Sequence, residues 1–277
     1  MDFAKMRSVA QLFFRRNATR GVSTKWLFKT HTRLLRSFLR HHTFEVEKAG
    51  DFTYLRVDRT PFVWPANADL EPLKNLLAEL LIPDHPHQYD YGLTRLSPRE
   101  VLLDVGCCEG GFAAKAAAGG ATVIAVEPSR RMSGVIRRLF ELRGLPSPTI
   151  KECLLGSRSG EACFQENEED PAQSRFAETK VPNSYPISLS TIDQLVAGLE
   201  VKPTYLKCDA EGADFGILQG GREFLQEFRP KIAITTYHAS EDFVRMRDYL
   251  VSLGYKVEGK GLIYIGGELR VVMIHAA

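Results

Sequence analysis

The chain of 277 residues is long enough for one substantial domain with an extension. Its 44% apolar and 25% charged residues are typical of a globular protein with a hydrophobic core. No apolar run approaches the roughly 18 residues that span a bilayer, and no signal-peptide pattern is found. Five cysteines, with no CxxC pair and no histidines at zinc spacing, argue against a disulfide framework or a structural metal, so we expect a reduced, cytoplasmic protein.

Positive charge is concentrated in residues 1–42, which contain ten Lys or Arg residues and a single acid. Four of these cations recur at spacings of 4, 3 and 4, namely Lys29, Arg33, Arg36 and Arg40. This spacing predicts a basic face on a helix. A solvated face on a docked helix is the simplest interpretation, while contact with an anionic surface at a membrane periphery and an organelle-targeting peptide remain alternatives. We expect no specific contact with nucleic acid.

Residues 43–100 predict a small preamble to the main domain. Two runs at 44–47 and 52–57 alternate apolar and polar residues around Gly50-Asp51, which indicates a β-hairpin. Leucines at positions 70, 73, 77 and 80 then predict a helix that Pro83 ends.

From residue 101 to 277 the chain alternates predicted strands and helices and forms the third expected unit. The expected strands are 101–105, 122–126, 149–155, 204–208 and 231–236, and the expected helices are 112–118, 129–143, 192–199, 215–228 and 241–253. Two β-rich runs at 262–265 and 270–275 flank Gly266-Gly267 and predict a hairpin. The pattern predicts an α/β fold with a doubly wound, mostly parallel sheet, an antiparallel C-terminal hairpin and an N-terminal helical and β extension. Residues 165–186 predict a long loop of the kind that often forms a lid.

A glycine turn follows the first strand of this unit, in Asp104-Val105-Gly106-Cys107-Cys108-Glu109-Gly110-Gly111-Phe112. Glycines let the backbone approach a ligand outside the carboxyl ends of the strands. A dinucleotide site requires G-x-G-x-x-G, but here the middle glycine is missing. The turn therefore favours a ligand without a pyrophosphate over a nicotinamide cofactor.

Acidic residues follow two further strands. Glu127 comes 17 residues after Gly110, close to the spacing of about 20 residues that is typical of a ribose-binding acid. Asp209 and Glu211 follow the strand 204–208 and are expected at the same edge of the sheet, although Glu211 is equally suited to cap the next helix. Two carboxylates alone are weak evidence for a cation, and we expect no metal site.

Several motifs in order and at matching spacing resemble those of the FkbM family of S-adenosylmethionine methyltransferases. They are Asp104–Phe112 with D-V-G-A-N-x-G-x-F, Glu127-Pro128 with E-P, Thr191-Ile192-Asp193 with T-L-D, Leu206–Ala213 with I-K-x-D-x-E-G-A, Leu218–Gly221 with L-x-G-A, and Arg229-Pro230 through His238 with R-P followed by E-x-H. The resemblance covers about residues 100–240. It implies a Rossmann-like class I methyltransferase fold with S-adenosylmethionine as its cofactor.

The resemblance also implies the members of the site. The cofactor residues are Asp104, Gly106, Cys107, Gly110, Phe112, Glu127, Pro128, Leu155, Ser157 and Asp209. The catalytic candidates are Asp209, Glu211 and His238, with His238 the first choice for the base because histidine titrates near neutral pH. The family methylates mainly hydroxyls of sugars, glycolipids and natural products, which predicts a small-molecule or glycan acceptor.

This sequence departs from the family pattern at several positions. Cys107-Cys108 replaces Ala-Asn, Ser157 stands where an Asp is usual, and Thr236 or Tyr237 takes the place of a Glu. N-methylation of a peptide amide, a nicotinamide oxidoreductase and a non-catalytic cofactor-binding protein remain alternatives to O-methylation.

Overall fold

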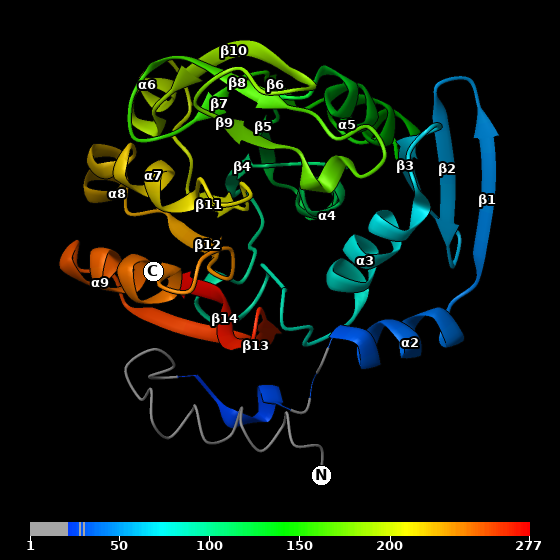
Figure 1. Ribbon diagram of the computed structural model, residues 1–277, viewed down its shortest axis with the longest axis horizontal. Coiled ribbons are helices and arrows are strands. Elements are labelled where there is room, and N and C mark those ends of the chain that lie inside the picture. Colours follow the sequence, from blue (N-terminus) through cyan, green and yellow to red (C-terminus); the bar gives the residue numbers. More distant parts are fainter. Residues whose placement is uncertain (1–21, 28, 30) are drawn as a thin grey trace.

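The computed structural model describes residues 22–27, 29 and 31–277, which form a central α/β core flanked by two smaller sheets (Figure 1). The first half of the basic segment, residues 1–21, lies outside the described residues. The central sheet has seven strands in the order β13-β14-β12-β11-β4-β5-β6. Their bounds are Val257–Ile265, Glu268–Ala276, Lys231–Thr235, Tyr205–Cys208, Val101–Val105, Thr122–Val126 and Thr149–Lys151.

The central sheet is parallel except at its C-terminal edge. Strands β4, β5, β6, β11 and β12 run parallel, whereas β14 pairs antiparallel with both β12 and β13. The chain leaves β4 towards β5 and β6 and later returns to β11 on the other side of β4. The order therefore reverses between β4 and β11, which is where doubly wound sheets bind their ligands. This confirms the predicted fold class.

Helices cover both faces of the sheet. Alternate strand residues point to opposite faces, so Leu102 and Val123 join one core and Leu103 and Ile124 join the other. The first core packs against α3 (Leu70–Leu81), α4 (Gly111–Ala118) and α5 (Arg130–Leu142). The second packs against α6 (Ile192–Ala197), α7 (Asp214–Gln219), α8 (Arg222–Phe228) and α9 (Asp242–Ser252).

The predicted hairpin of the preamble is present, together with a third strand. Strands β1 (Phe44–Ala49) and β2 (Phe52–Val57) pair antiparallel, and β3 (Thr60–Pro65) adds to β2 and packs against α5. In the sequence, the prolines of β3 argue against a strand. They are tolerated because β3 lies at the edge of its sheet.

The segment between β6 and α6 forms a second small sheet where a long loop is predicted. Strands β7 (Leu154–Leu155), β10 (Ser184–Ser190), β8 (Gly160–Gln165) and β9 (Arg175–Ala177) lie in that order. The predicted strand 149–155 is therefore two strands in two sheets, and a short helix, η3 (Pro171–Gln173), connects β8 to β9.

Close backbone contact explains why the predicted helix 215–228 is two helices. The break falls at Gly220-Gly221, between α7 and α8. A Cβ on Gly220 would stand 2.0 Å from the carbonyl oxygen of Gly156, so the chain passes too close to the neighbouring loop for any side chain.

The basic stripe does not lie on one helix, because Lys29 comes before the helix that carries the three arginines. The helix α2 (His31–His41) begins after Lys29, whose Nζ lies 3.3 Å from Asp84 Oδ2. Arg33, Arg36 and Arg40 are exposed on α2, while Phe38 is buried. Among the described residues, no helix is long and apolar enough to cross a membrane.

Candidate active site

A cavity of about 340 Å³ opens at the carboxyl ends of β5, β4 and β11. This volume lies within the range of small-molecule sites, about 300–1,000 Å³. Three parts of the chain line it: the strand ends, the preamble and the segment that connects β8 to β9. The cavity thus coincides with the switch point of the sheet.

The glycine turn after β4 forms the floor of the cavity. Gly106 has φ 68°, and a Cβ there would lie 1.9 Å from the carbonyl oxygen of Asp209, so only glycine fits. Cys108 also has a positive φ, 49°, and its N–H is turned towards Glu127. The replacement of the family's Ala-Asn by cysteines therefore leaves a turn that acts through its backbone.

Glu127 lies between two backbone amides at the end of β5. Its Oε2 accepts the Cys108 N–H at 2.9 Å and its Oε1 accepts the Ser129 N–H at 3.0 Å. Burial raises the pKa of Glu127 to about 7, although the Ser129 and Cys108 amides favour the charged form. A carboxylate has about four acceptor positions, so two remain for hydroxyl donors of a ligand.

A buried ion pair supports the turn from below. Lys207 Nζ lies 3.0 Å from Asp104 Oδ1, and both side chains are almost fully buried. The ammonium also donates to the carbonyl oxygens of Val105 and Gly106. Asp104 is therefore engaged beneath the turn and does not line the cavity, and Lys207 holds the turn by its carbonyls.

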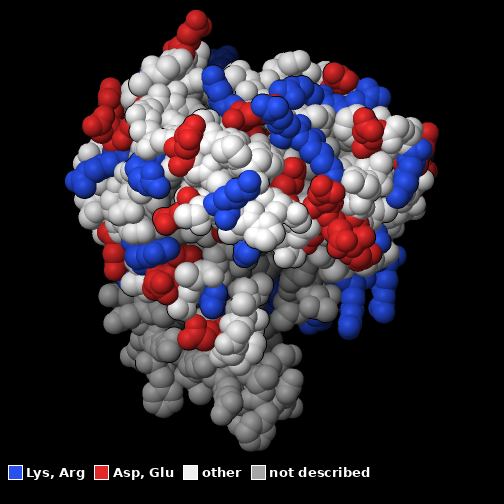
Figure 2. Space-filling model, turned by 45° about the horizontal axis from the view of Figure 1, so that its top comes forward, with Lys and Arg blue, Asp and Glu red and all other residues white. Residues whose placement is uncertain are grey.

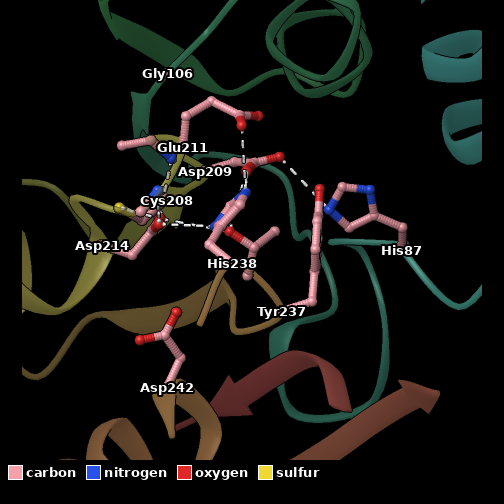
Figure 3. Close-up of polar contacts among 12 residues, drawn as sticks. His87, Gly106, Cys208, Asp209, Glu211, Asp214, Tyr237, His238 and Asp242 are labelled. Carbon is pink, nitrogen blue, oxygen red and sulfur yellow. Dashed lines mark hydrogen bonds and ion pairs between the residues drawn. The ribbon is translucent and has the colours of Figure 1, made fainter. Parts of the chain in front are cut away.

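Asp209 lies between two histidines at the end of β11 (Figure 3). Its Oδ2 accepts the Tyr89 hydroxyl at 2.7 Å and its Oδ1 accepts the Thr235 hydroxyl at 3.0 Å. His87 Nε2 lies 3.5 Å from Oδ2. Burial raises the pKa of Asp209, but the positive potential of His87, Lys207 and His238 outweighs it and the pKa is lowered.

His87 comes from the preamble and faces the cavity beside Asp209. Its Nδ1 lies 2.6 Å from Glu79 Oε2, on α3. Burial lowers the pKa of His87, but the carboxylates of Glu79 and Asp209 more than compensate, so the pKa is raised. The Glu79 contact orients the ring and leaves Nε2 towards Asp209 and the cavity.

His238 lies behind the carboxylates rather than in the cavity wall. Its Nδ1 is 3.2 Å from Asp214 Oδ2, and its Nε2 is 3.6 Å from Glu211 Oε2 and 3.8 Å from Asp209 Oδ1. Burial lowers its pKa, but the three carboxylates raise it to about 11. Both ring nitrogens thus face acids of this chain and not the space where an acceptor would lie.

A segment of the small sheet covers the open side of the cavity. Residues 170–176 line it, including η3 and the start of β9. The backbone N–H of Asp69 donates to the Glu169 carbonyl at 2.9 Å, and Arg131 donates to the Glu168 carbonyl at 3.0 Å. The segment predicted as a lid is therefore anchored to the preamble and to α5.

The structure brings together about half of the residues expected in the site. Those that line the cavity are Gly106, Glu127, Pro128, Leu155, Asp209 and Glu211. Cys107 and Phe112 line a smaller adjoining cavity of about 50 Å³. Gly110, with φ 77°, precedes the first turn of α4, and Ser157 is exposed beyond β7, so neither lines the main cavity.

The contribution of the preamble was not predicted from the sequence, whereas residues 170–176 lie in the segment 165–186 that was predicted as a lid. Glu79, His87, Tyr237 and residues 170–176 all line the cavity. The one available signal was the polar cluster His85-Pro86-His87, because two histidines beside a proline are unusual in a plain connection.

The doubly wound sheet, the glycine turn after β4 and the carboxylate after β5 together form the fold of the class I methyltransferases, the class that uses S-adenosylmethionine. The model of the methyltransferase FkbM domain matches residues 104–257, more than half of the chain. The chain therefore belongs to the FkbM methyltransferase family.

Solved structures with a similar arrangement include other methyltransferases. Methyltransferase FkbM from Methylobacillus flagellatus KT is 22% identical with a TM-score of 0.49, and the match covers 76% of this chain and 56% of that one. Precorrin-6y C5,15-methyltransferase from Geobacter metallireducens GS-15 is 14% identical with a TM-score of 0.43, covering 67% of this chain and 83% of that one. This chain thus spans little more than half of the Methylobacillus protein. No curated protein sequence matches the chain.

Proposed function

We propose that the protein transfers a methyl group from S-adenosylmethionine to a hydroxyl group of an uncharged acceptor, such as a sugar, a glycolipid or a natural product. The observation that carries the proposal is a single cavity with Glu127 at the end of β5 and the Asp209–His87 pair across the switch point. Glu127 suits a cofactor ribose. The Asp209–His87 pair suits an acceptor hydroxyl that must lose a proton.

The residues at the glycine turn fit the cofactor. Glu127 keeps acceptor capacity for two ribose hydroxyls, since each of its oxygens accepts one backbone N–H. The turn has no third glycine to hold a pyrophosphate, and S-adenosylmethionine has none. When bound, the cofactor supplies an electrophilic methyl group on a sulfonium, which leaves as a neutral thioether.

The charge of the cavity supports an uncharged acceptor. Five carboxylate side chains line it, those of Glu79, Glu127, Asp170, Asp209 and Glu211, against the single arginine Arg175. Negative potential favours the cationic sulfonium and disfavours carboxylate or phosphate groups on the acceptor. A sugar hydroxyl matches this surface better than an acidic substrate does.

We assign the proton acceptor to His87 and a positioning role to His238. His87 lines the cavity, and Glu79 orients its ring. As the acceptor oxygen bonds to the methyl carbon, Nε2 of His87 takes the hydroxyl proton and the carbon–sulfur electron pair stays on sulfur. Alignment of the acceptor oxygen with the carbon–sulfur bond provides the remaining rate acceleration, as is general for in-line displacements.

Methyl transfer can be measured with radiolabelled cofactor against glycan, lipid and peptide fractions. The proposal predicts label in the glycan or glycolipid fraction, in a bond that is stable as an ether. Label confined to peptide amides would show that the enzyme is an N-methyltransferase and that the acceptor assignment is wrong.

Replacing Glu127 by alanine is expected to weaken S-adenosylmethionine binding by about 1.5–3 kcal/mol, the scale of hydrogen bonds to a charged group. Calorimetric titration measures the change directly. Glu141→Ala, an exposed acid on α5, is the matched control and is expected to bind like the wild type. Equal affinity of the wild type and Glu127→Ala would remove Glu127 from the ribose site.

The helix α2 supports a second, peripheral proposal, contact with an anionic surface such as a lipid membrane. Its sequence contains three arginines and no acid, whereas charges of both signs are interspersed over the face in Figure 2. Each cation near an anionic membrane contributes about 1 kcal/mol.

Replacing Arg33, Arg36 and Arg40 by glutamine is therefore expected to weaken binding to phosphatidylserine vesicles by about a hundredfold, from roughly 3 kcal/mol. Cosedimentation measures this. A triple change of exposed cations elsewhere, at Arg56, Arg222 and Lys256, is the control. Equal losses in both variants would mean that only net charge matters.

A further inference from the structure

Three side chains at the rear of the cavity converge on one point. They are Asp209 and Glu211, from the loop after β11, and His238, from the loop after β12. One ligand atom from each lies within 4.8 Å of the other two. Figure 3 shows Asp209 and Glu211 on one side of the His238 ring and Asp214 on the other.

The distances leave space between His238 and its carboxylates. Nε2 lies 3.6 Å from Glu211 Oε2 and 3.8 Å from Asp209 Oδ1. A charge-assisted N–H···O bond is about 2.7–2.9 Å long, so neither contact is a hydrogen bond. Two ligands of one metal ion at bond lengths of about 2.0–2.2 Å stand some 3–3.6 Å apart, close to what is observed.

Neither ring nitrogen of His238 makes a hydrogen bond among the described residues, although Nδ1 lies 3.2 Å from Asp214 Oδ2; Nε2 is the one that faces the two other acids. Its lone pair or proton faces two carboxylates. One of them, Asp209, has only 14% of its side chain exposed. A positive charge beside Asp209 and Glu211 stabilises such an arrangement, and either a proton on His238 or a bound cation supplies it.

Asp214 gives the ring the orientation that a metal ligand needs. This fully buried carboxylate lies 3.2 Å from His238 Nδ1, which directs Nε2 to the two other acids. Its oxygens also accept the N–H groups of Ala210 at 3.0 Å and Gly212 at 3.2 Å. A carboxylate on the far nitrogen of a metal-binding histidine is the usual second partner at such sites.

The loop that carries Glu211 is bent to bring its side chain back. Glu211 has φ 48° and Gly212 has φ 96°, so two successive residues are left-handed. For a glutamate this conformation costs on the order of 1–3 kcal/mol. This strained backbone brings the Glu211 carboxylate to the point that Asp209 and His238 share.

We propose that Asp209, Glu211 and His238 bind a divalent metal ion, and that the acceptor hydroxyl completes its coordination. Asp209 and Glu211 line the cavity, so the ion would meet the acceptor on that side. One imidazole with two carboxylates suits Mn²⁺ or Fe²⁺ better than Mg²⁺, which prefers oxygen ligands alone. The ion would hold the hydroxyl in place and make its proton easier for His87 to remove. This role rests on the proposed methyl transfer to a hydroxyl, whereas the binding site itself does not.

The sequence predicted Asp209, Glu211 and His238 as catalytic candidates, but only the two carboxylates were weighed as cation ligands, so no metal site was expected. His238 comes 27 residues after Glu211, and only the adjacent positions of β11 and β12 in the sheet bring it beside them.

Mn²⁺ binding to the full chain tests the proposal, by calorimetry and by electron paramagnetic resonance. The wild type is expected to bind one Mn²⁺ saturably, and Glu211→Gln to bind at least tenfold more weakly. Glu241→Gln, an exposed acid near His238 in the sequence, is the matched control and is expected to change affinity less than twofold. Thermal unfolding of each variant shows whether it is folded.

A coupling of the Mn²⁺ electron spin to nitrogen identifies the imidazole ligand. The wild type is expected to show this coupling and His238→Gln to lose it, a signature that a structural role of His238 would not move. No saturable Mn²⁺ in the wild type, equal affinity in Glu211→Gln, or no nitrogen coupling would overturn the proposal and leave a proton on His238. Because the readout is metal binding, failure here leaves the methyl transfer assay as a separate test of the proposed function.

Discussion

Replacing His87 by alanine is expected to lower kcat by about a hundred- to ten-thousand-fold, the range for loss of a general base. The affinity for S-adenosylmethionine should stay nearly unchanged, because Glu127 is held by the Cys108 and Ser129 amides, whereas His87 is held by Glu79. Free imidazole in the assay is expected to restore part of the rate, since the alanine leaves space for it beside Glu79. Steady-state kinetics with and without imidazole measures both effects.

Two comparison variants make this result specific. Glu79→Gln keeps the imidazole but weakens its orientation, so a smaller loss of kcat is expected. His41→Ala, on the exposed end of α2, should have the wild-type rate. A His87→Ala enzyme at full rate, or a loss that imidazole does not restore at all, would remove His87 from the proton transfer.

Replacing Lys207 by methionine is expected to destabilise the fold by about 3–5 kcal/mol, the cost of leaving a partner charge buried and unpaired. Lys207 and Asp104 are 5% and 1% exposed, so water cannot replace the lost ammonium. The carbonyl oxygens of Val105 and Gly106 lose their donor as well, so cofactor binding should weaken with the turn. Denaturant unfolding measures the first effect and calorimetry the second.

The double variant Asp104→Asn with Lys207→Met separates charge from packing. Because no unpaired charge remains, it is expected to recover most of the lost stability relative to Lys207→Met alone. If the double variant is as unstable as the single one, packing of the lysine stem and not the ion pair accounts for the loss.

The central fold followed from sequence patterns with a direct physical cause. Buried strands such as 101–105 and 122–126 read as short apolar runs, and the glycine turn and Gly266-Gly267 mark positions that only glycine occupies easily. Elements that depend on distant contacts were harder to predict. The break at Gly220 depends on the Gly156 carbonyl, which is remote in the sequence.

The residues of the site also divide into those with a local sequence signal and those that depend on distant contacts. Glu127 and Asp209 were predictable because the carboxyl ends of parallel strands meet at one edge of the sheet. His87 and Glu79 were not, because α3 and the loop after it have no fixed place relative to the sheet until the preamble packs on α5. His238 was predicted near Asp209 and Glu211, but the sequence could not show that Asp214 would hold its ring behind them.

The most direct test of the account is calorimetric titration of the wild-type protein with S-adenosylmethionine and, separately, with NAD. The account predicts saturable binding of one S-adenosylmethionine per chain, with no measurable binding of NAD, because the turn at Gly106 lacks the glycine that a pyrophosphate needs. Binding of NAD without binding of S-adenosylmethionine would contradict it.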